Sequence, residues 1–188
     1  MHSIFSISRK NGGFSLTELL VVIAVVGILA AIIFPYYGSV RKQLSLQRSA
    51  NKLVQDIRRV QGMALSAEEV GGEIPEGGYG MYLKKNPSPQ KSYILFADKD
   101  SNCKYTPAAG TGKEERIEEI SFEEGVKIKD LSANYINIIF QPPEPGTYLK
   151  DNDGNDLGPL VTIEICLIDD ELKSKTIKIN KAGLIYVE

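Results

Sequence analysis

An uncharged run near the N-terminus sets the strongest limit on how this chain can fold. No residue from Leu19 to Val40 carries a formal charge, and most of the run is aliphatic. At a helical rise of about 1.5 Å per residue, the run is long enough to cross the hydrocarbon core of a membrane, which is roughly 30 Å thick. The sequence therefore predicts a membrane-spanning helix over residues 14–40.

Glu18 lies at the edge of this run, where an ionised carboxylate needs a partner. Placing a charge within a membrane helix costs about 2.5 kcal/mol or more. No lysine or arginine occurs between Gly12 and Val40. Cleavage after Gly13 would create a cation nearby, because the new α-amino group of Phe14 would lie within about one helical turn of the carboxylate. The amine of a neighbouring subunit is an equally suitable partner.

The segment KNGG at residues 10–13, followed by FSLTELLVVIAVVGILAAIIFP, resembles the leader and N-terminal helix of type IV prepilins and type II secretion pseudopilins. This resemblance implies cleavage after Gly13 by a prepilin peptidase and N-methylation of Phe14. It also implies that Glu18 docks the amine of an adjacent filament subunit, and that Pro35 kinks the helix. The implied partners are other pilin or pseudopilin subunits, the prepilin peptidase and N-methyltransferase, the inner-membrane assembly platform and membrane lipid.

A plain single-pass anchor is the alternative explanation of the N-terminal run. An ordinary secretory signal fits less well, because its apolar part would be removed, whereas here that part follows the predicted cut. Arg9 and Lys10 place the N-terminus on the cytoplasmic side by the positive-inside rule, although Arg41 and Lys42 reduce the contrast. The expected location is the inner (plasma) membrane, with the C-terminal domain in the periplasm or at the cell exterior.

Charge is balanced over the whole chain but uneven along it. The 188 residues include 22 basic and 24 acidic ones, which gives a net charge of −2. This net charge does not indicate nucleic-acid binding. Six basic residues lie between Arg41 and Arg59, against Asp56 alone, while residues 114–124 are strongly acidic. Oppositely charged neighbouring subunits and two separate solvated faces explain this asymmetry equally well.

The residue pattern after the membrane run predicts an α+β fold. Apolar residues recur every three or four positions from Val40 to Leu65, so an amphipathic helix is expected over residues 41–70, ending near Glu69. Arg48, Lys52, Asp56 and Arg59 lie outside this stripe. From residue 71 to residue 188 we expect a globular domain with an antiparallel sheet on which the long helix packs. The predicted strands are residues 80–83, 92–97, 117–122, 125–128, 135–140, 161–167, 176–179 and 184–187, with a loop over 141–159.

The order of these segments strengthens the resemblance. FADKD at residues 96–100, IIFQP at 138–142 and IKINKAGLI at 177–185 are similar to H-type pseudopilins of type II secretion and to related minor pilins of type IV pili. The resemblance implies a position at or near the filament tip and a role in starting assembly. The loop over residues 141–159 departs from the family pattern.

Two cysteines and two acidic loops are further candidate sites. Cys103 and Cys166 fit either one disulfide or two unrelated thiols, and the alternation of residues 161–167 places Cys166 on the polar side. Oxygen ligands are abundant in residues 98–102 and 151–156. In the second loop, Asp151, Asp153 and Asp156 suit a Ca²⁺ turn, but aspartate, asparagine and glycine are also the commonest turn formers.

The sequence predicts a structural protein rather than an enzyme. The only histidine, His2, lies in the predicted leader (residues 1–13), and no GxSxG, P-loop or HExxH motif is present. The expected function is that of a minor subunit of a type II secretion pseudopilus or a type IV pilus, acting in protein secretion or pilus assembly. The alternatives are a membrane-anchored binding module, with or without calcium dependence, and a DNA-uptake minor pilin, for which the basic segment is a weak indication.

Overall fold

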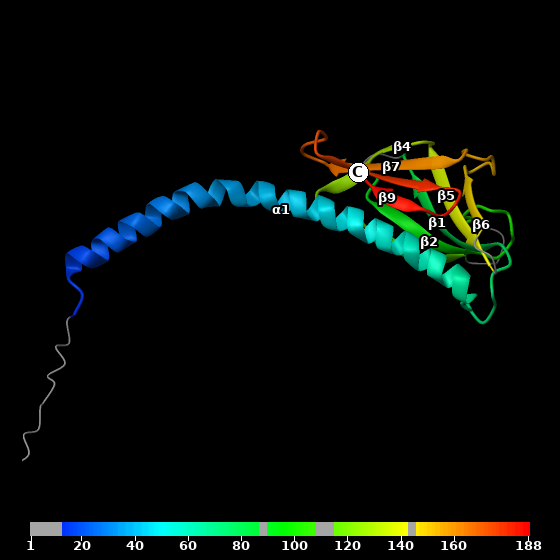
Figure 1. The fold of residues 1–188 in the computed structure, drawn as a ribbon, viewed down its shortest axis with the longest axis horizontal. Coiled ribbons are helices and arrows are strands. Elements are labelled where there is room, and N and C mark those ends of the chain that lie inside the picture. Colours follow the sequence, from blue (N-terminus) through cyan, green and yellow to red (C-terminus); the bar gives the residue numbers. More distant parts are fainter. Residues whose placement is uncertain (1–12, 87–89, 108–114, 143–145) are drawn as a thin grey trace, which may run out of the picture. The chain divides into compact units, whose positions relative to one another are not determined.

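The computed structural model describes residues 13–86, 90–107, 115–142 and 146–188, without the side chains of residues 34–36. The chain divides into two compact units, residues 1–40 and 41–188. A helix, α1 (Leu16–Ser66), begins in the first unit and ends in the second (Figure 1). The strands in the described part of the chain are β1 (Gly78–Lys84), β2 (Ser92–Asp98), β3 (Arg116–Ser121), β4 (Val126–Leu131), β5 (Tyr135–Gln141), β6 (Gly146–Lys150), β7 (Leu160–Leu167), β8 (Ser174–Asn180) and β9 (Ile185–Val187).

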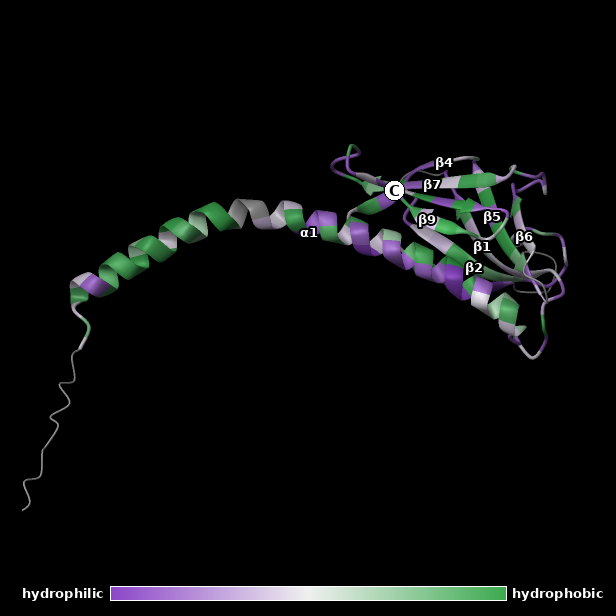
Figure 2. Ribbon diagram, in the orientation of Figure 1, coloured by the Kyte–Doolittle hydropathy of each residue, from purple (hydrophilic) through white to green (hydrophobic). Residues whose placement is uncertain are grey.

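The first part of α1 is apolar on every side. Figure 2 shows almost continuous apolar colouring there, in contrast to the mixed colouring of the second part. None of Leu16–Ile33 is buried within the chain, and its length and composition suit a membrane span. Such a surface needs lipid or protein to cover it. Pro35 lies among the residues whose side chains are outside the described part, so the kink stays a prediction.

From residue 41 onward α1 is amphipathic, as the sequence predicts. Two residues of the predicted stripe, Leu44 and Leu65, are exposed, one near each end of the packed segment. Between them the buried apolar residues of α1 recur every three or four positions, so one face of the helix covers the sheets. These residues are Leu46, Ala50, Leu53, Val54, Ile57, Val60, Met63 and Ala64.

The helix ends at Ser66, before the predicted end near Glu69. Ala67 adopts a positive φ of 47°, and the N–H of Glu68 donates to the carbonyl oxygen of Met63 at 3.1 Å. This is a Schellman arrangement, which satisfies carbonyl groups that the last helical turn leaves without partners. Gly71 and Gly72, which follow, are therefore not needed to end the helix.

The strands form two antiparallel sheets, where the sequence predicts one. Their orders are β3-β2-β1-β5-β6 and β4-β7-β8-β9. The chain leaves the first sheet after β3, enters the second with β4 and returns with β5. Strand β6 lies inside the predicted 141–159 loop and pairs with β5 at the sheet edge. This strand has only five residues and follows a proline-rich segment. It is too short to be identified by alternation of apolar and polar residues.

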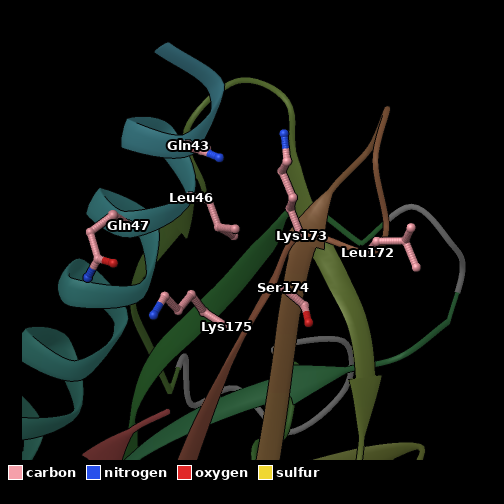
Figure 3. A pocket seen from close by; sticks show the side chains of 7 residues that line it. All are labelled: Gln43, Leu46, Gln47, Leu172, Lys173, Ser174 and Lys175. Carbon is pink, nitrogen blue, oxygen red and sulfur yellow. The ribbon is translucent and has the colours of Figure 1, made fainter. Parts of the chain in front are cut away.

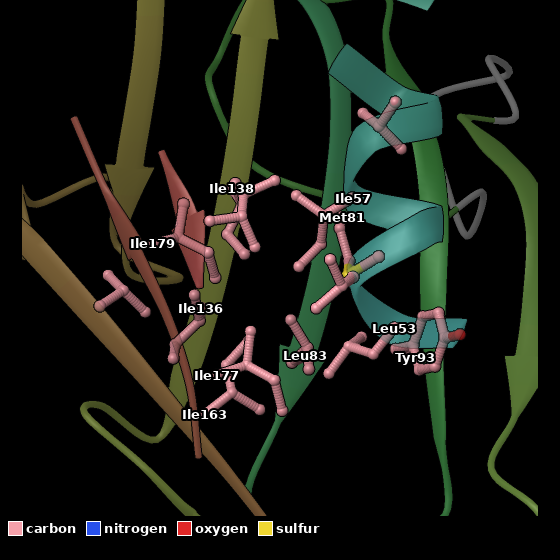
Figure 4. Close-up of a cluster of buried hydrophobic side chains, with 14 of the residues drawn as sticks. Leu53, Ile57, Met81, Leu83, Tyr93, Ile136, Ile138, Ile163, Ile177 and Ile179 are labelled. Carbon is pink, nitrogen blue, oxygen red and sulfur yellow. The ribbon is translucent and has the colours of Figure 1, made fainter. Parts of the chain in front are cut away.

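The core of the second unit lies between α1 and both sheets. Figure 4 shows Leu53 and Ile57 of α1 pointing towards Met81 and Leu83 of β1, with isoleucines of β5, β7 and β8 beyond them. All four of these named side chains are fully buried. The α+β fold class, with a long helix packed on antiparallel sheets, is therefore confirmed.

Two residues predicted to lie outside the core are buried. Asp56 is only 9% exposed, and the Tyr93 hydroxyl of β2 donates to its Oδ2 at 2.6 Å. Cys166 is fully buried, although strand alternation places it opposite the core face. Its cross-strand neighbour Lys127, which pairs with Glu171 at 2.5 Å, shares that face. Long side chains of this kind shield a small thiol beneath them.

The Tyr93–Asp56 hydrogen bond joins α1 to the first sheet and predicts a measurable stability loss. Tyr93→Phe leaves a nearly buried carboxylate without this donor, so the free energy of unfolding should fall by about 1–3 kcal/mol. Urea unfolding of the full chain in detergent measures this change. Tyr148→Phe, at a 38%-exposed position, is the matched control and should change little. Equal losses in the two variants would contradict the expectation.

Candidate functional site

Ser15 and Glu18 form a reciprocal cap at the start of α1. The N–H and Oγ of Ser15 donate to Oε2 of Glu18 at 3.1 and 3.2 Å, and the N–H of Glu18 donates back to Ser15 Oγ at 3.2 Å. A serine followed three residues later by a glutamate is the sequence signature of this capping box. The signature is present in the sequence at Ser15 and Glu18, so Glu18 has a local partner besides any cation.

The cap leaves part of the Glu18 carboxylate available. Ser15 engages Oε2, whereas no donor from the described residues reaches Oε1. Gly13 and Phe14 precede the helix, and the Phe14 side chain is 90% exposed. Glu18 therefore lies in the first helical turn, next to the predicted cleavage point, with one oxygen open to an external donor. Neither the cleavage nor the methylation is tested by this geometry.

The basic part of α1 pairs with acidic residues of the same chain. Arg59 Nη1 lies 2.9 Å from Glu118 Oε2 on β3, and Lys42 Nζ lies 2.6 Å from Asp169 Oδ2. All four side chains are about half exposed or more, so each pair contributes little to stability. The uneven distribution of charge along the sequence is thus partly balanced by ion pairs within the chain. These pairs weaken the case for phosphate binding by the basic residues 41–59.

In the loop after β6, protein donors occupy two of the predicted calcium ligands. Asp151 accepts hydrogen bonds from the backbone N–H groups of Asp153 and Asn155 at 2.9 and 2.8 Å. Asp156 pairs with Lys181 at 2.7 Å. The side-chain hydrogen bond from Asn155 lowers the pKa of Asp151, and the one from Lys181 lowers that of Asp156. These contacts are those of a hydrogen-bonded turn.

A tighter cluster of carboxylates forms where β2 ends and β3 begins. Asp98, Asp100 and Glu115 each place an oxygen within 4.8 Å of the other two. Asp98 is fully buried and Glu115 is 3% exposed. Burial raises the pKa of Asp98 to about 6 and that of Glu115 to about 7, with the neighbouring carboxylates adding to both shifts. The sequence identifies the 98–102 loop, but not Glu115.

The buried amide of Asn137 links the two acidic loops. Its Oδ1 accepts a hydrogen bond from the N–H of Tyr105 at 2.9 Å, and its Nδ2 donates to the carbonyl oxygen of Asp151 at 3.1 Å. Both loops are therefore attached to β5 through one side chain. Their proximity cannot be read from the sequence, because it depends on β5 lying between β1 and β6.

The two cysteines are free thiols. Cys103 lies in the loop after β2 of the five-stranded sheet, whereas Cys166 lies on β7 of the other sheet. Of the two explanations that the sequence leaves open, the structure therefore supports unrelated thiols over a disulfide. Burial raises the pKa of both groups.

An open pocket of about 310 Å³ lies between the second part of α1 and the residues around the start of β8. In Figure 3, Gln43 and Leu46 of α1 face Lys173, while Leu172 points outward. The other described lining residues are Gln47, Ser174 and Lys175. Amide, ammonium and hydroxyl groups line it, and the described lining contains no carboxylate or imidazole that would act as a general base.

Comparison with known proteins identifies the N-terminal segment. A model of the prokaryotic N-terminal methylation motif matches residues 8–34. A probable transcriptional regulatory protein of Arabidopsis thaliana is 24% identical over 166 residues, which are 81% of this chain and 48% of that protein. The chain thus spans about half the length of this relative, at an identity too low to assign a family.

Among solved structures, the type IV minor pilin FimU of Pseudomonas aeruginosa has a TM-score of 0.43 and 13% sequence identity, over 76% of this chain and 87% of that one. The methylation motif, by contrast, covers Gly13, Phe14, Glu18 and the apolar run as far as Phe34. The chain therefore carries a prepilin-type N-terminal methylation signal.

Proposed function

We propose that this chain is a structural subunit of a type IV pilus or a type II secretion pseudopilus. The observation that carries the proposal is the exposed apolar helix Leu16–Ile33, which begins within the matched methylation motif. A helix that is apolar on all sides is stable in lipid or among similar helices. A prepilin-type subunit uses both environments, first as a membrane-stored precursor and then as part of a filament core.

In this proposal, packing between apolar helices supplies most of the association free energy, and Glu18 sets the register between subunits. Its Oε1 would accept the methylated amine of Phe14 from a neighbour, while Ser15 holds Oε2. A charge pair of this kind gives more specificity than net stability. The subunit would be a substrate of the prepilin peptidase and methyltransferase, and its own role structural rather than enzymatic.

The finer assignment rests on the sequence resemblance. We place the chain among the H-type pseudopilins and related minor pilins, at or near the filament tip. Residues 14–40 would lie in the inner membrane, and the second unit in the periplasm or at the cell exterior. The assembly platform of the inner membrane would then be a partner, together with other subunits.

Intact mass measurement and N-terminal sequencing of the protein from membranes of its native cells test this proposal. We expect a mature chain that begins with N-methylated Phe14. The variant Gly13→Val should retain the leader, because a bulky residue replaces the glycine at the cleavage point. Gly27→Ala is the control, since a Cβ at this helical position meets nothing within 4 Å, and it should be processed normally.

A leader that remains on the wild-type chain, in cells with an active prepilin peptidase, would contradict the proposal. The anchored binding module would then be the better explanation. Processing without recovery of the chain in sheared filaments would instead separate maturation from assembly, and would argue against a filament subunit.

A further inference from the structure

The pocket between α1 and the start of β8 lies close to the membrane segment along the chain. Its first lining residue, Gln43, follows the end of the uncharged run at Val40 by three positions. Three residues span at most about 11 Å even when they are fully extended. The polar headgroup layer is about 5–7 Å thick on each side of the hydrocarbon core. If residues 14–40 cross the membrane, as the proposed function requires, the pocket therefore lies within reach of lipid headgroups.

The lining of this pocket presents hydrogen-bond donors. Figure 3 shows Lys173 opposite Gln43, and Lys175 extending towards Gln47. Gln47 donates to Oδ1 of Asn51 at 3.1 Å, which uses one of its two amide N–H groups. Ammonium and side-chain amide groups are common donors to phosphate oxygens. The described lining includes no carboxylate that would repel an anion, so the pocket suits a phosphate group.

The acids of the turn between β7 and β8, next to the pocket, are paired with lysines. The ion pairs are Asp169 with Lys42 at 2.6 Å, Asp170 with Lys173 at 3.4 Å and Glu171 with Lys127 at 2.5 Å. Lys175 forms no ion pair with a described residue. The pocket and this turn together therefore keep a net positive charge, which favours an anionic ligand.

The tip of this turn is apolar. The N–H of Lys173 donates to the carbonyl oxygen of Asp170 at 3.0 Å, so Glu171 and Leu172 are the central residues of a tight turn. Leu172 is 95% exposed and points away from the pocket (Figure 3), and Leu44 on α1 is 47% exposed. At a membrane interface, apolar side chains enter the boundary of the acyl chains while lysines contact anionic headgroups. The turn thus places the apolar part of a lipid contact beside its polar part.

We propose that this pocket binds the headgroup phosphate of an anionic phospholipid, with Leu172 inserted at the boundary between headgroups and acyl chains. Lys173 and Lys175 would contact phosphate oxygens, while the amides of Gln43 and Gln47 donate to other oxygens of the headgroup. The contact would hold the second unit at the membrane surface while the chain is stored as a precursor. It rests on the proposed membrane span, but it does not require the chain to enter a filament.

Native mass spectrometry of the full chain in a non-ionic detergent tests the site, with phosphatidylglycerol, phosphatidylcholine or inorganic phosphate added. We expect more phosphatidylglycerol than phosphatidylcholine to bind, and inorganic phosphate at the same concentration to leave lipid binding unchanged. The double variant Lys173→Ala/Lys175→Ala should lower phosphatidylglycerol binding by about fivefold or more. Lys84→Ala/Lys104→Ala is the matched control, because it removes two lysines outside the pocket lining, and it should bind as the wild type does.

Leu172→Ser tests the apolar part of the contact without damage to the fold. Because Leu172 is 95% exposed, the variant should unfold at the wild-type temperature, yet bind phosphatidylglycerol about threefold less or weaker still. Unchanged lipid binding in this variant would overturn the proposed insertion of Leu172. Equal phosphatidylglycerol binding by the two double-lysine variants would overturn the pocket as the site. Equal binding of both lipids, or displacement of lipid by inorganic phosphate, would overturn the assignment of an anionic lipid.

Carbonate extraction of cell membranes separates the lipid site from the proposed function. The wild type and both double-lysine variants should stay in the membrane fraction, because residues 14–40 and not the pocket hold the chain there. Release of the wild type would show that the membrane span is wrong, and with it both proposals. Retention of the wild type without any preference for phosphatidylglycerol would overturn the lipid site alone.

Discussion

Glu18→Gln is expected to reduce incorporation of this chain into filaments by about 100-fold while the N-terminal helix stays formed. Removing one partner of a desolvated charge pair costs at least ~3 kcal/mol, which corresponds to that factor. Glutamine still completes the capping box with Ser15, so the substitution removes the charge and keeps the cap. Immunoblots of sheared filaments, normalised to the amount of chain in membranes, measure the effect.

Ser15→Ala is the matched control, because it removes the capping hydroxyl and keeps the carboxylate charge. Loss of a serine cap costs about 1 kcal/mol, and the backbone N–H of residue 15 still faces Glu18. We expect incorporation to fall by about fivefold or less. If Ser15→Ala impairs incorporation as strongly as Glu18→Gln, the function of Glu18 is to cap the helix, and the proposed contact between subunits is wrong.

Leu53→Ala is expected to produce the largest loss of stability among single substitutions in the helical stripe. Leu53 is fully buried against β1, and truncation of a buried leucine to alanine costs about 2–5 kcal/mol through lost burial and the cavity left behind. For a unit of this size, such a loss lowers the unfolding temperature by roughly 5–20 °C. Thermal unfolding of the full chain in detergent, followed by circular dichroism, provides the measurement.

Leu65→Ala provides the comparison on the same helix. Leu65 belongs to the predicted stripe but is 59% exposed, so its truncation should change stability by about 0.5 kcal/mol or less. Similar losses at the two positions would mean that Leu65 is covered in the protein as it exists in solution, and that the helix face is wider than the structure indicates.

Periodicity predicted best the elements that bury a regular face. The helical stripe around Leu53 and the alternation of Val161, Ile163 and Ile165 are confirmed for this reason. Periodicity could not show that the strands form two sheets and not one. The partner of β4 is β7, which lies far away in the sequence. It also placed Asp56 outside the stripe, because no local pattern reveals that Tyr93 of β2 donates to it.

The candidate sites were predictable where the chemistry is local. The N-terminal signal occupies consecutive residues, so the sequence alone locates the segment that the methylation-motif model matches, residues 8–34. The carboxylate cluster joins Asp98 to Glu115 through antiparallel pairing of β2 and β3, and residues that far apart cannot be matched by spacing. The acidic loop with the more regular pattern, residues 151–156, has its charges satisfied by its own backbone and by Lys181.

The cap at Ser15 has a consequence for the proposed cleavage after Gly13. Both members of the capping box lie on the C-terminal side of the Gly13–Phe14 bond, and the backbone at that bond is not helical. A protease acting there would meet a chain that needs no local unwinding, and the hydrogen bonds between Ser15 and Glu18 would lie wholly within the helix that it leaves behind. Precursor and mature chain would then share one helix conformation, so removal of the leader changes the charge next to Glu18 without refolding the segment.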